Sequence, residues 1–299
     1  MQIVTDQGAD LSPEQVEGFN IKSVPLNITI NGKTYISGVD IDAKTFYEIL
    51  TTTQAFPTTS QPSPGDFARV YRELAKDDPE ILSIHMSAGI SGTVNTARMG
   101  ADLVPEARVT IIDSKTLSCP LGWQVEAAAK GLRAGMNLEE VTRLLERIQK
   151  YAEGMYVVPD LKYLIHGGRI SHLKGLMASI LKIKPVIGIT KDDGKYYTLG
   201  QDILFSKAIQ RMVDTIAHKM PQTKTLRIQI LHGSNPDGVA DLRDRLDRAY
   251  ECWYNKTVAV APFLGAHVGP GMVGLAVAPL DIFDLPGLDI IPKLVRTLE

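Results

Sequence analysis

The chain has 299 residues, of which 44% are hydrophobic and 22% charged, and its 32 basic and 34 acidic side chains give a formal net charge of -2. This composition is that of a globular protein, so it excludes intrinsic disorder and a fibrous fold. The absence of a basic excess also argues against a dedicated nucleic-acid binder.

Short apolar runs alternate with helical patterns in the first half of the chain. Apolar positions at i, i+3, i+4 and i+7 predict a helix over 67–74, and an apolar stripe predicts another over 138–148. Buried strands are predicted at Ile81–Met86, Val109–Asp113 and Met155–Val158. Because strands alternating with helices imply right-handed crossovers and a parallel sheet, we expect a doubly wound α/β domain over residues 1–155.

A segment rich in hydroxyls and prolines, Thr58–Pro64, lacks apolar periodicity. It is predicted to be a loop that leads into the helix beginning near Gly65. Such a loop can present hydroxyl donors to an oxyanion, or it can be a rigid surface turn. The residues alone favour the turn.

The segment Met86–Thr93 leaves a predicted strand and opens a helix. Ser91 is predicted to be the N-cap, and Gly92 lets a ligand approach the backbone closely. Free amides and the helix dipole at such a terminus bind a phosphate or a carboxylate, and open α/β sheets bind ligands at the carboxyl ends of their strands. Simple helix capping explains the same residues equally well.

The order of predicted strands and helices differs in the second half of the chain. It predicts an α+β domain with a mixed sheet over residues 156–299. Asp192-Asp193-Gly194-Lys195 stands between two strand-like runs and predicts a hairpin, which makes one strand pair antiparallel. The further predicted elements are helices around Ile209–Ile216 and Val239–Tyr250, and strands at Leu226–Leu231, Thr257–Ala261 and Met272–Ala278. The domain boundary is placed near residue 155.

Two glycine-rich segments of this half carry groups that can bind a ligand. His166-Gly167-Gly168-Arg169-Ile170 ends a helix-like segment, where a glycine suits the C-terminal cap and Arg169 offers a cation; the residues alone favour the cap. Gly265–Gly271 surrounds His267 with three glycines and a proline, in a loop predicted to join two strands. An imidazole fixed there can bond a carboxylate, or simply the backbone.

Several familiar motifs are incomplete or absent. Gly32-Lys33-Thr34 resembles the end of a P-loop, but Asn27 stands where the first glycine is required. No G-x-G-x-x-G follows a predicted strand, and the sequence has no H-E-x-x-H and no EF-hand loop. We therefore predict no nucleotide, metal or other cofactor site in this chain.

A hydrolase is the main rival hypothesis. Ser91, Asp113 and His267 occur in the chain order of an α/β-hydrolase triad, but Thr93 replaces the second glycine of G-x-S-x-G. A lipid esterase or thioesterase using Ser91 and His267 stays open as an alternative. A regulatory or transport module for another apolar carboxylate is the third hypothesis.

Taken together, these segments resemble the DegV family of fatty-acid-binding proteins, which includes the FakB subunit of bacterial fatty acid kinase. The similarity extends over nearly the whole chain. Its motifs are Thr59-Ser60-Gln61-Pro62, Ile90-Ser91-Gly92-Thr93, Val109–Ser114, Tyr163–Ile170, Lys182-Ile183-Lys184-Pro185 and Gly265–Gly271.

The resemblance implies two α/β domains that enclose one long-chain fatty acid, with the tail in an apolar tunnel. Thr59 and Ser91 would hydrogen-bond the carboxyl group, His267 would be a third partner, Gly92 would add a backbone amide, and Arg169 falls in the family's G-G-R-I segment. A separate ATP-dependent fatty acid kinase would phosphorylate the carboxyl group to an acyl phosphate, so this chain would not itself be an enzyme. Transient contact with a membrane is compatible with that role.

The tunnel would be lined by apolar side chains, for any one of which core packing is the alternative role. Those proposed are Met86, Met177, Ile180, Leu181 and Met272. The physics agrees with this arrangement, because a buried carboxylate must be hydrogen-bonded while the tail contributes about 0.8 kcal/mol per buried CH₂. Affinity should therefore come mainly from the tail, and the polar groups should select an acid over an alcohol or ester.

Two features depart from the resemblance. Relatives often begin with Asp-Ser-Thr or Asp-Ser-Ser, whereas this chain has Gln7 and Gly8 after Asp6, which removes two small hydroxyls. Residues 280–299 are longer than the usual ending, and their apolar side chains are expected to cover the tunnel or a dimer surface.

The N-terminus and the cysteines indicate the cellular compartment in which the protein is expected. Met1–Asp6 has no basic n-region and is not predicted to be a signal peptide. Cys119 and Cys252 lie outside any C-x-x-C motif and suggest a reducing compartment. The most apolar stretches are too short, or carry lysines, and do not predict a transmembrane span. We expect a soluble, cytoplasmic protein.

Overall fold

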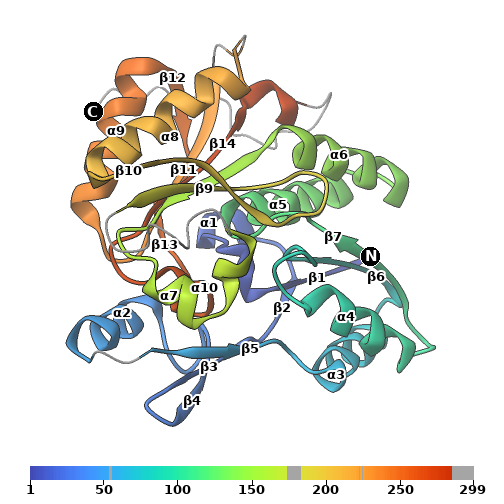
Figure 1. Cartoon of the computed structure of the whole chain (residues 1–299). Coiled ribbons are helices and arrows are strands. Elements are labelled where there is room, and N and C mark those ends of the chain that lie inside the picture. The colour runs from blue at the N-terminus through green and yellow to red at the C-terminus, as the bar shows by residue number, and fades with distance from the viewer. Residues whose placement is uncertain (54–55, 174–182, 222, 224, 285–299) are drawn as a thin grey trace.

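The computed structural model of the chain describes residues 1–299 except 54–55, 174–182, 222, 224 and 285–299 (Figure 1). Three sheets organise the described residues. A four-stranded parallel sheet has the order β2-β1-β6-β7, a small antiparallel sheet has the order β4-β3-β5, and a mixed sheet has the order β10-β9-β8-β14-β11-β12, with β13 paired to β11.

The N-terminal sheets take their strands from the first 113 residues. The parallel sheet contains β1 (Gln2–Asp6), β2 (Ile21–Val24), β6 (Glu80–His85) and β7 (Arg108–Asp113). The small sheet contains β3 (Asn27–Ile30), β4 (Lys33–Ile36) and β5 (Thr58–Ser60).

The mixed sheet takes its strands from the rest of the chain. These are β8 (Glu153–Val157), β9 (Lys184–Ile189), β10 (Tyr196–Asp202), β11 (Thr225–His232), β12 (Glu251–Tyr254), β13 (Val258–Ala259) and β14 (Val273–Pro279). Only the pairs of β11 with β12 and with β13 are parallel.

The helices cover these sheets and connect their strands. In chain order they are α1 (Pro13–Val16), α2 (Ala43–Thr52), α3 (Pro64–Leu74), α4 (Thr93–Asp102), α5 (Cys119–Arg133), α6 (Leu138–Tyr151), α7 (Lys162–His166), α8 (Phe205–Lys219), α9 (Pro236–Ala249) and α10 (Pro262–Val268). Short 3-10 helices occur at η1 (Gln7–Ala9), η2 (Arg169–His172) and η4 (Leu280–Phe283). Within the described part of the chain, no helix is both long and apolar enough to cross a membrane.

Helix packing produces three apolar cores. Helices α3 and α4 cover one face of the parallel sheet, and α8 and α9 cover the outer face of the mixed sheet (Figure 1). Helix α5 contacts β1 and β6 of the parallel sheet and β8 and β14 of the mixed sheet. Because α5 is packed between the two sheets, nearly every one of its residues is buried. The α5 core is therefore one connection between the two halves.

The predicted α/β class is confirmed, with a parallel N-terminal sheet and a mixed C-terminal sheet. The strands expected at 81–86, 109–113 and 155–158 are β6, β7 and β8, displaced by two residues at most. The predicted hairpin is the antiparallel pair β9 and β10. Residue 155 lies inside β8, and the division into domains 1–155 and 156–299 stays a prediction.

Two segments that the sequence predicts to be loops are instead a strand and a helix. Thr58–Ser60 is β5, because its backbone pairs with β3 in the register Thr59↔Ile28, which apolar periodicity cannot reveal in three residues. His267 lies not in a loop but near the end of α10, a helix that begins with Pro262 at its first turn. Gly269, with φ 72°, ends this helix, so the glycines mark a helix terminus.

Candidate ligand-binding site

An apolar pocket lies between the loop after β6, the start of α5, α10 and one face of the mixed sheet. The cavity that these elements enclose has a volume of about 40 Å³. Its apolar lining includes Met86, Ile90, Leu117, Ile189, Phe263, Leu264 and Met272, and its polar lining is Ser91, Ser118, Tyr156, Arg169, Tyr196 and His267. Both halves of the chain therefore contribute to one pocket.

Of the side chains expected to line a tunnel, Met86 and Met272 do line this pocket. Met177, Ile180 and Leu181 lie outside the described residues. Residues 285–299 of the C-terminal segment also lie outside them, whereas Ile282 and Phe283 are buried.

His267 is held at the pocket by Thr59. The Nε2 atom of His267 lies 2.8 Å from the Thr59 hydroxyl oxygen, a contact that joins α10 to β5 across 208 positions of sequence. The ring is 6% exposed, and its Nδ1 atom has no hydrogen-bond partner. Burial, reinforced by the charge of Arg169, lowers the pKa of His267 to about 3. The imidazole is therefore neutral at physiological pH.

Gly167 allows this histidine to be placed where it is. A Cβ atom on Gly167 would lie 2.2 Å from His267 Nδ1, so a larger residue would push the ring away. Gly168, with φ 76°, then turns the chain so that Arg169 begins η2. The prediction that glycine ends the helix before Arg169 is confirmed, with Gly167 as the C-cap of α7.

Arg169 brings a positive charge to the same pocket. Its Nη1 atom donates a hydrogen bond of 2.6 Å to the Gly167 carbonyl oxygen. It lowers the pKa of His267 and opposes the rise that burial causes in the pKa of Tyr196, so its guanidinium lies near both side chains. Among the described residues that line the pocket, Arg169 is the one permanent cation.

Ser91 and Gly92 occupy the turn into α4. Gly92, not Ser91, is the N-cap residue, so the predicted capping role of Ser91 was wrong. The Ser91 hydroxyl is instead 2.8 Å from the Thr93 hydroxyl and 8% exposed. A Cβ on Gly92 would lie 2.3 Å from the Gln61 side chain, so this turn packs against the segment that follows Thr59. The structure thus places Ser91, Arg169 and His267 on one pocket, with Thr59 bound to the imidazole and Gly92 adjacent to Ser91.

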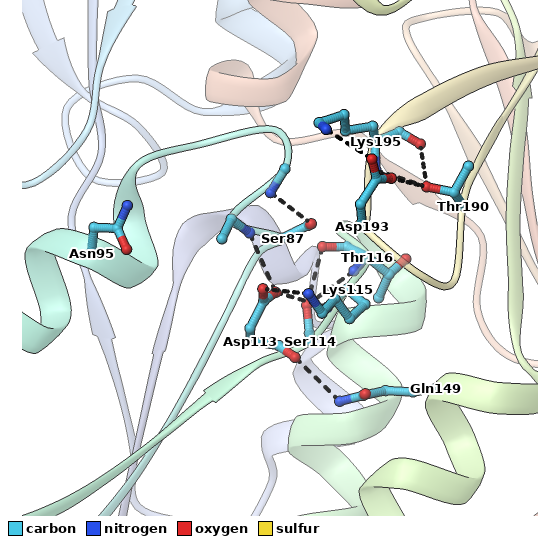
Figure 2. Close-up of polar contacts among 12 residues, drawn as sticks. Ser87, Asn95, Asp113, Ser114, Lys115, Thr116, Gln149, Thr190, Asp193 and Lys195 are labelled. Carbon is cyan, nitrogen blue, oxygen red and sulfur yellow. Dashed lines mark hydrogen bonds and ion pairs between the residues drawn. The ribbon is translucent and has the colours of Figure 1, made fainter.

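The hydrolase triad is not assembled. Asp113 accepts hydrogen bonds from the backbone amides of Ala88 and Lys115 and pairs with the Lys115 ammonium at 3.3 Å (Figure 2). No carboxylate of the described residues contacts His267, whose one hydrogen bond goes to Thr59. Without a carboxylate to orient its ring, His267 lacks the arrangement by which a histidine base activates a serine nucleophile.

The tip of the β9–β10 hairpin packs against the loop after β6, next to the pocket. Inside the turn, the Asp193 carboxylate accepts hydrogen bonds from the Thr190 hydroxyl at 2.5 Å and from the Lys195 amide (Figure 2). A Cβ on Gly194 would lie 1.9 Å from the Ser87 hydroxyl, and one on Gly89 would lie 2.2 Å from the Asp193 carbonyl oxygen. The two halves therefore meet here through close contacts that only glycine permits.

The altered N-terminal loop contributes shape rather than hydroxyls. Gln7 accepts a hydrogen bond from the Leu26 amide and does not line the pocket. A Cβ on Gly8 would lie 2.2 Å from the terminal methyl group of Met86, which is a lining residue. Gly8 therefore makes room for Met86.

Two lining tyrosines were missed from the sequence. Tyr156 lies on β8 and Tyr196 begins β10, and their rings meet edge to face with centroids 5.9 Å apart. Tyrosine is common in strands, so neither residue carries a sequence signal that distinguishes pocket from core.

Comparison with known proteins gives consistent matches over nearly the full length. The model of the family described as "Uncharacterised protein, DegV family" matches residues 1–280. A DegV domain-containing protein of Staphylococcus aureus strain N315 is 36% identical over 275 residues, which cover 92% of this chain and 97% of that protein. A DegV domain-containing protein of Deinococcus radiodurans is 32% identical over 280 residues, with coverage of 93% and 98%.

Solved structures agree with these sequence matches. A structure of a DegV family protein from Thermus thermophilus, described as showing fatty acid binding, has a TM-score of 0.83 at 31% identity and covers 93% of this chain and 99% of its own. The structure of DegV from Bacillus subtilis, described as a fatty acid binding protein, has a TM-score of 0.82 at 28% identity and covers 93% and 98%.

Proposed function

The chain belongs to the DegV family, and from this premise we propose that it binds one long-chain fatty acid in the pocket described above and presents the carboxyl group to a separate ATP-dependent kinase. The observation that carries the proposal is the composition of the pocket. A lining that is mostly apolar includes one cation, one neutral histidine and two buried serines.

The tail of the acid would supply most of the affinity. Each methylene that leaves water contributes about 0.8 kcal/mol, so a chain of a dozen or more methylenes outweighs a few hydrogen bonds to the head group. The apolar side chains contributed by β6, α5, α10 and the mixed sheet provide the required surface. The pocket would therefore hold the tail between the two halves.

The head group would be held by the Thr59 hydroxyl, with His267 behind it. A buried imidazole N–H without a partner is more costly than a bare ring nitrogen, so the proton of the neutral ring belongs on Nε2 and is donated to the Thr59 oxygen. The Thr59 hydroxyl hydrogen is then free for a carboxylate. Ser91 would supply a second hydroxyl and Gly92 a backbone amide, while Arg169 would balance the negative charge.

This chain would act as a carrier and not carry out the phosphorylation. In the proposed sequence the kinase transfers the γ-phosphoryl group of ATP to a carboxylate oxygen, giving acyl phosphate and ADP. The residues named here would position the carboxylate and keep the tail out of water.

Mass spectrometry of the denatured, purified protein tests the binding step. We expect one fatty acid per chain, and neither alcohol nor ester in comparable amount. Incubation with ATP and a fatty acid kinase catalytic subunit tests presentation, since acyl phosphate should form only when this chain is present. A protein that carries no acid, and takes none up after delipidation, would contradict the proposal.

A further inference from the structure

The carboxylate of Asp10 is an ionisable group that the proposed head-group site does not use. Asp10 ends η1 in the left-handed backbone conformation, with φ 43°. Its Oδ2 atom accepts a hydrogen bond from the Ser118 hydroxyl, and its Oδ1 atom accepts one of 2.8 Å from the Ala261 amide. These partners lie 108 and 251 positions away in sequence, so one carboxylate joins three distant segments of the chain.

Both partners of Asp10 stand at the beginning of elements that form walls of the pocket. Ser118 is the N-cap residue of α5 and lines the pocket itself. Ala261 is the N-cap residue of α10, the helix that carries His267. Asp10 does not line the pocket, so it holds these two walls from behind.

No positive charge balances the carboxylate of Asp10. The ionisable groups around it are Asp6 of β1, Tyr47 of α2 and Cys119 of α5. Burial, reinforced by the charge of Asp6, raises the pKa of Asp10 to about 6, although the hydrogen bonds from Ser118 and Ala261 oppose this rise. The carboxylate therefore takes up a proton just below neutral pH.

Protons reach Asp10 from a groove outside the pocket. Asp10 is half-buried and lines this groove together with Ser12, Ser37 and the exposed Asp42. Burial and Arg169 lower the pKa of His267, and Asp10 is not among the causes. The charge of Asp10 is therefore not felt at the imidazole, and its influence on a ligand must pass through the positions of α5 and α10.

We propose that Asp10 is a positioning residue of the pocket, whose ionised carboxylate holds the beginnings of α5 and α10 together and whose protonation weakens ligand binding. This inference rests on the proposed function, because it concerns the regulation of the same pocket. Hydrogen bonds to a charged acceptor are roughly twice as strong as those to a neutral one, so protonation loosens both contacts. Fatty acid binding is therefore tight above pH 7 and weakens as the pH falls through 6.

The dissociation constant of a fluorescent long-chain fatty acid, measured on the delipidated protein from pH 7.5 to pH 5, tests this inference. Asparagine imitates the protonated carboxyl group, because it is neutral and nearly identical in shape. Asp10→Asn should bind the probe about tenfold more weakly than the wild type at pH 7.5. The ratio of the two dissociation constants should fall towards one at pH 5. The carboxyl group of the probe titrates in both measurements and cancels in this ratio.

Two further variants locate the effect. Ser118→Ala removes a hydrogen bond that favours the carboxylate, so its affinity should begin to fall at a higher pH than that of the wild type. Asp42→Asn is the matched control. It neutralises another carboxylate of the same groove, and asparagine caps α2 as well as aspartate does. This variant should reproduce the wild-type pH profile.

The pH profile separates a positioning role from a merely structural one. A ratio of dissociation constants between Asp10→Asn and the wild type that stays constant from pH 7.5 to pH 5 would overturn the inference. If Asp10→Asn does not fold, an unshifted profile in Ser118→Ala would overturn it instead. A wild type that binds no fatty acid at any pH would contradict the proposed function, so the two failures are distinguishable.

Discussion

In the proposed site, the hydrogen bond between Thr59 and His267 would decide how a carboxylate is held. Because the imidazole is buried and neutral, the ring orients the threonine hydroxyl and does not itself supply a charge. Arg169, on a different element, supplies the charge. The proposed site would distinguish an acid from an alcohol through two separate groups, the Thr59 hydroxyl and the Arg169 guanidinium.

Replacing Thr59 with valine should weaken fatty acid binding by about tenfold to a hundredfold. Valine keeps the shape but removes a hydroxyl that would bond a charged carboxylate, and such a bond contributes about 1.5–3 kcal/mol. Calorimetry on the delipidated variant measures the loss, and Thr59→Ser is the matched control that should stay near the wild type. Equal affinity of the valine and serine variants would remove Thr59 from the site.

His267 should also make the folded state sensitive to acid. Its pKa is about 3 in the folded protein and about 6.5 in an unfolded chain, so the unfolded state binds more protons between these values. Its contribution to stability is therefore complete above pH 6.5 and is lost as the pH falls, by up to about 1.4 kcal/mol per pH unit.

Urea unfolding of the wild type and of His267→Gln between pH 7 and pH 4 checks this dependence. Glutamine does not titrate, so the difference in unfolding free energy between the two proteins should change with pH in favour of the variant as the pH falls. A difference that stays constant over this range would show that the imidazole is not held neutral.

The candidate site residues come from the family resemblance, not from spacing. On spacing alone, the segments around Thr59 and Arg169 favoured a surface turn and a helix cap. The motif similarity selected them, and the structure joins Thr59 to His267 and places Arg169 on the same pocket. Tyr156 belongs to no motif, and only the three-dimensional structure places it on the pocket.

At the scale of elements, periodicity predicted the long helices and buried strands well. It failed at β5 and α10, which are short and owe their form to tertiary contacts. β5 is a strand because its backbone pairs with that of β3. α10 is a helix of seven residues that packs against α2 and α7. Apolar periodicity needs more residues than these segments have.

The contact between the β9–β10 hairpin and the loop after β6 should depend on Gly194. An alanine there meets two obstacles, a positive φ of 65° and the Ser87 hydroxyl at 1.9 Å. We expect Gly194→Ala to displace the turn, lower the unfolding free energy and accelerate release of a bound acid, because Ile189 and Tyr196 on either side of the turn line the pocket. Stopped-flow displacement of a fluorescent fatty acid measures release.

Gly135→Ala is the matched control for backbone strain. Gly135 also has a positive φ, of 91°, but a Cβ there meets nothing within 4 Å. Its loss of stability should be only about 1 kcal/mol, with unchanged release of the acid. Identical stability and release in the two variants would mean that the hairpin contact does not control the pocket.

For the whole molecule, the two halves are joined through α5 by a buried ion pair. Glu126 of α5 lies 2.5 Å from Arg227 of β11, whose guanidinium is fully buried and stacks near the rings of Trp123 and Phe283. Burying these charges is favourable only while both are present. The pair therefore makes the packing of α5 against the mixed sheet sensitive to loss of either charge.

Glu126→Gln should lower the unfolding free energy by about 3–5 kcal/mol, because it leaves Arg227 buried without its counter-charge. Urea denaturation provides the measurement. Glu139→Gln, which removes an exposed carboxylate paired with Arg143, should cost less than about 1 kcal/mol. A small effect of Glu126→Gln, similar to that of Glu139→Gln, would show that the halves do not depend on this pair.

A crystal structure of the protein with a bound long-chain fatty acid tests the central claim most directly. The account predicts that the carboxyl oxygens lie within hydrogen-bond distance of the Thr59 and Ser91 hydroxyls, with Arg169 nearby and the tail running between Met86 and Met272. An acid bound elsewhere on the molecule, or lying in the pocket with its carboxyl group away from Thr59 and Ser91, would contradict it.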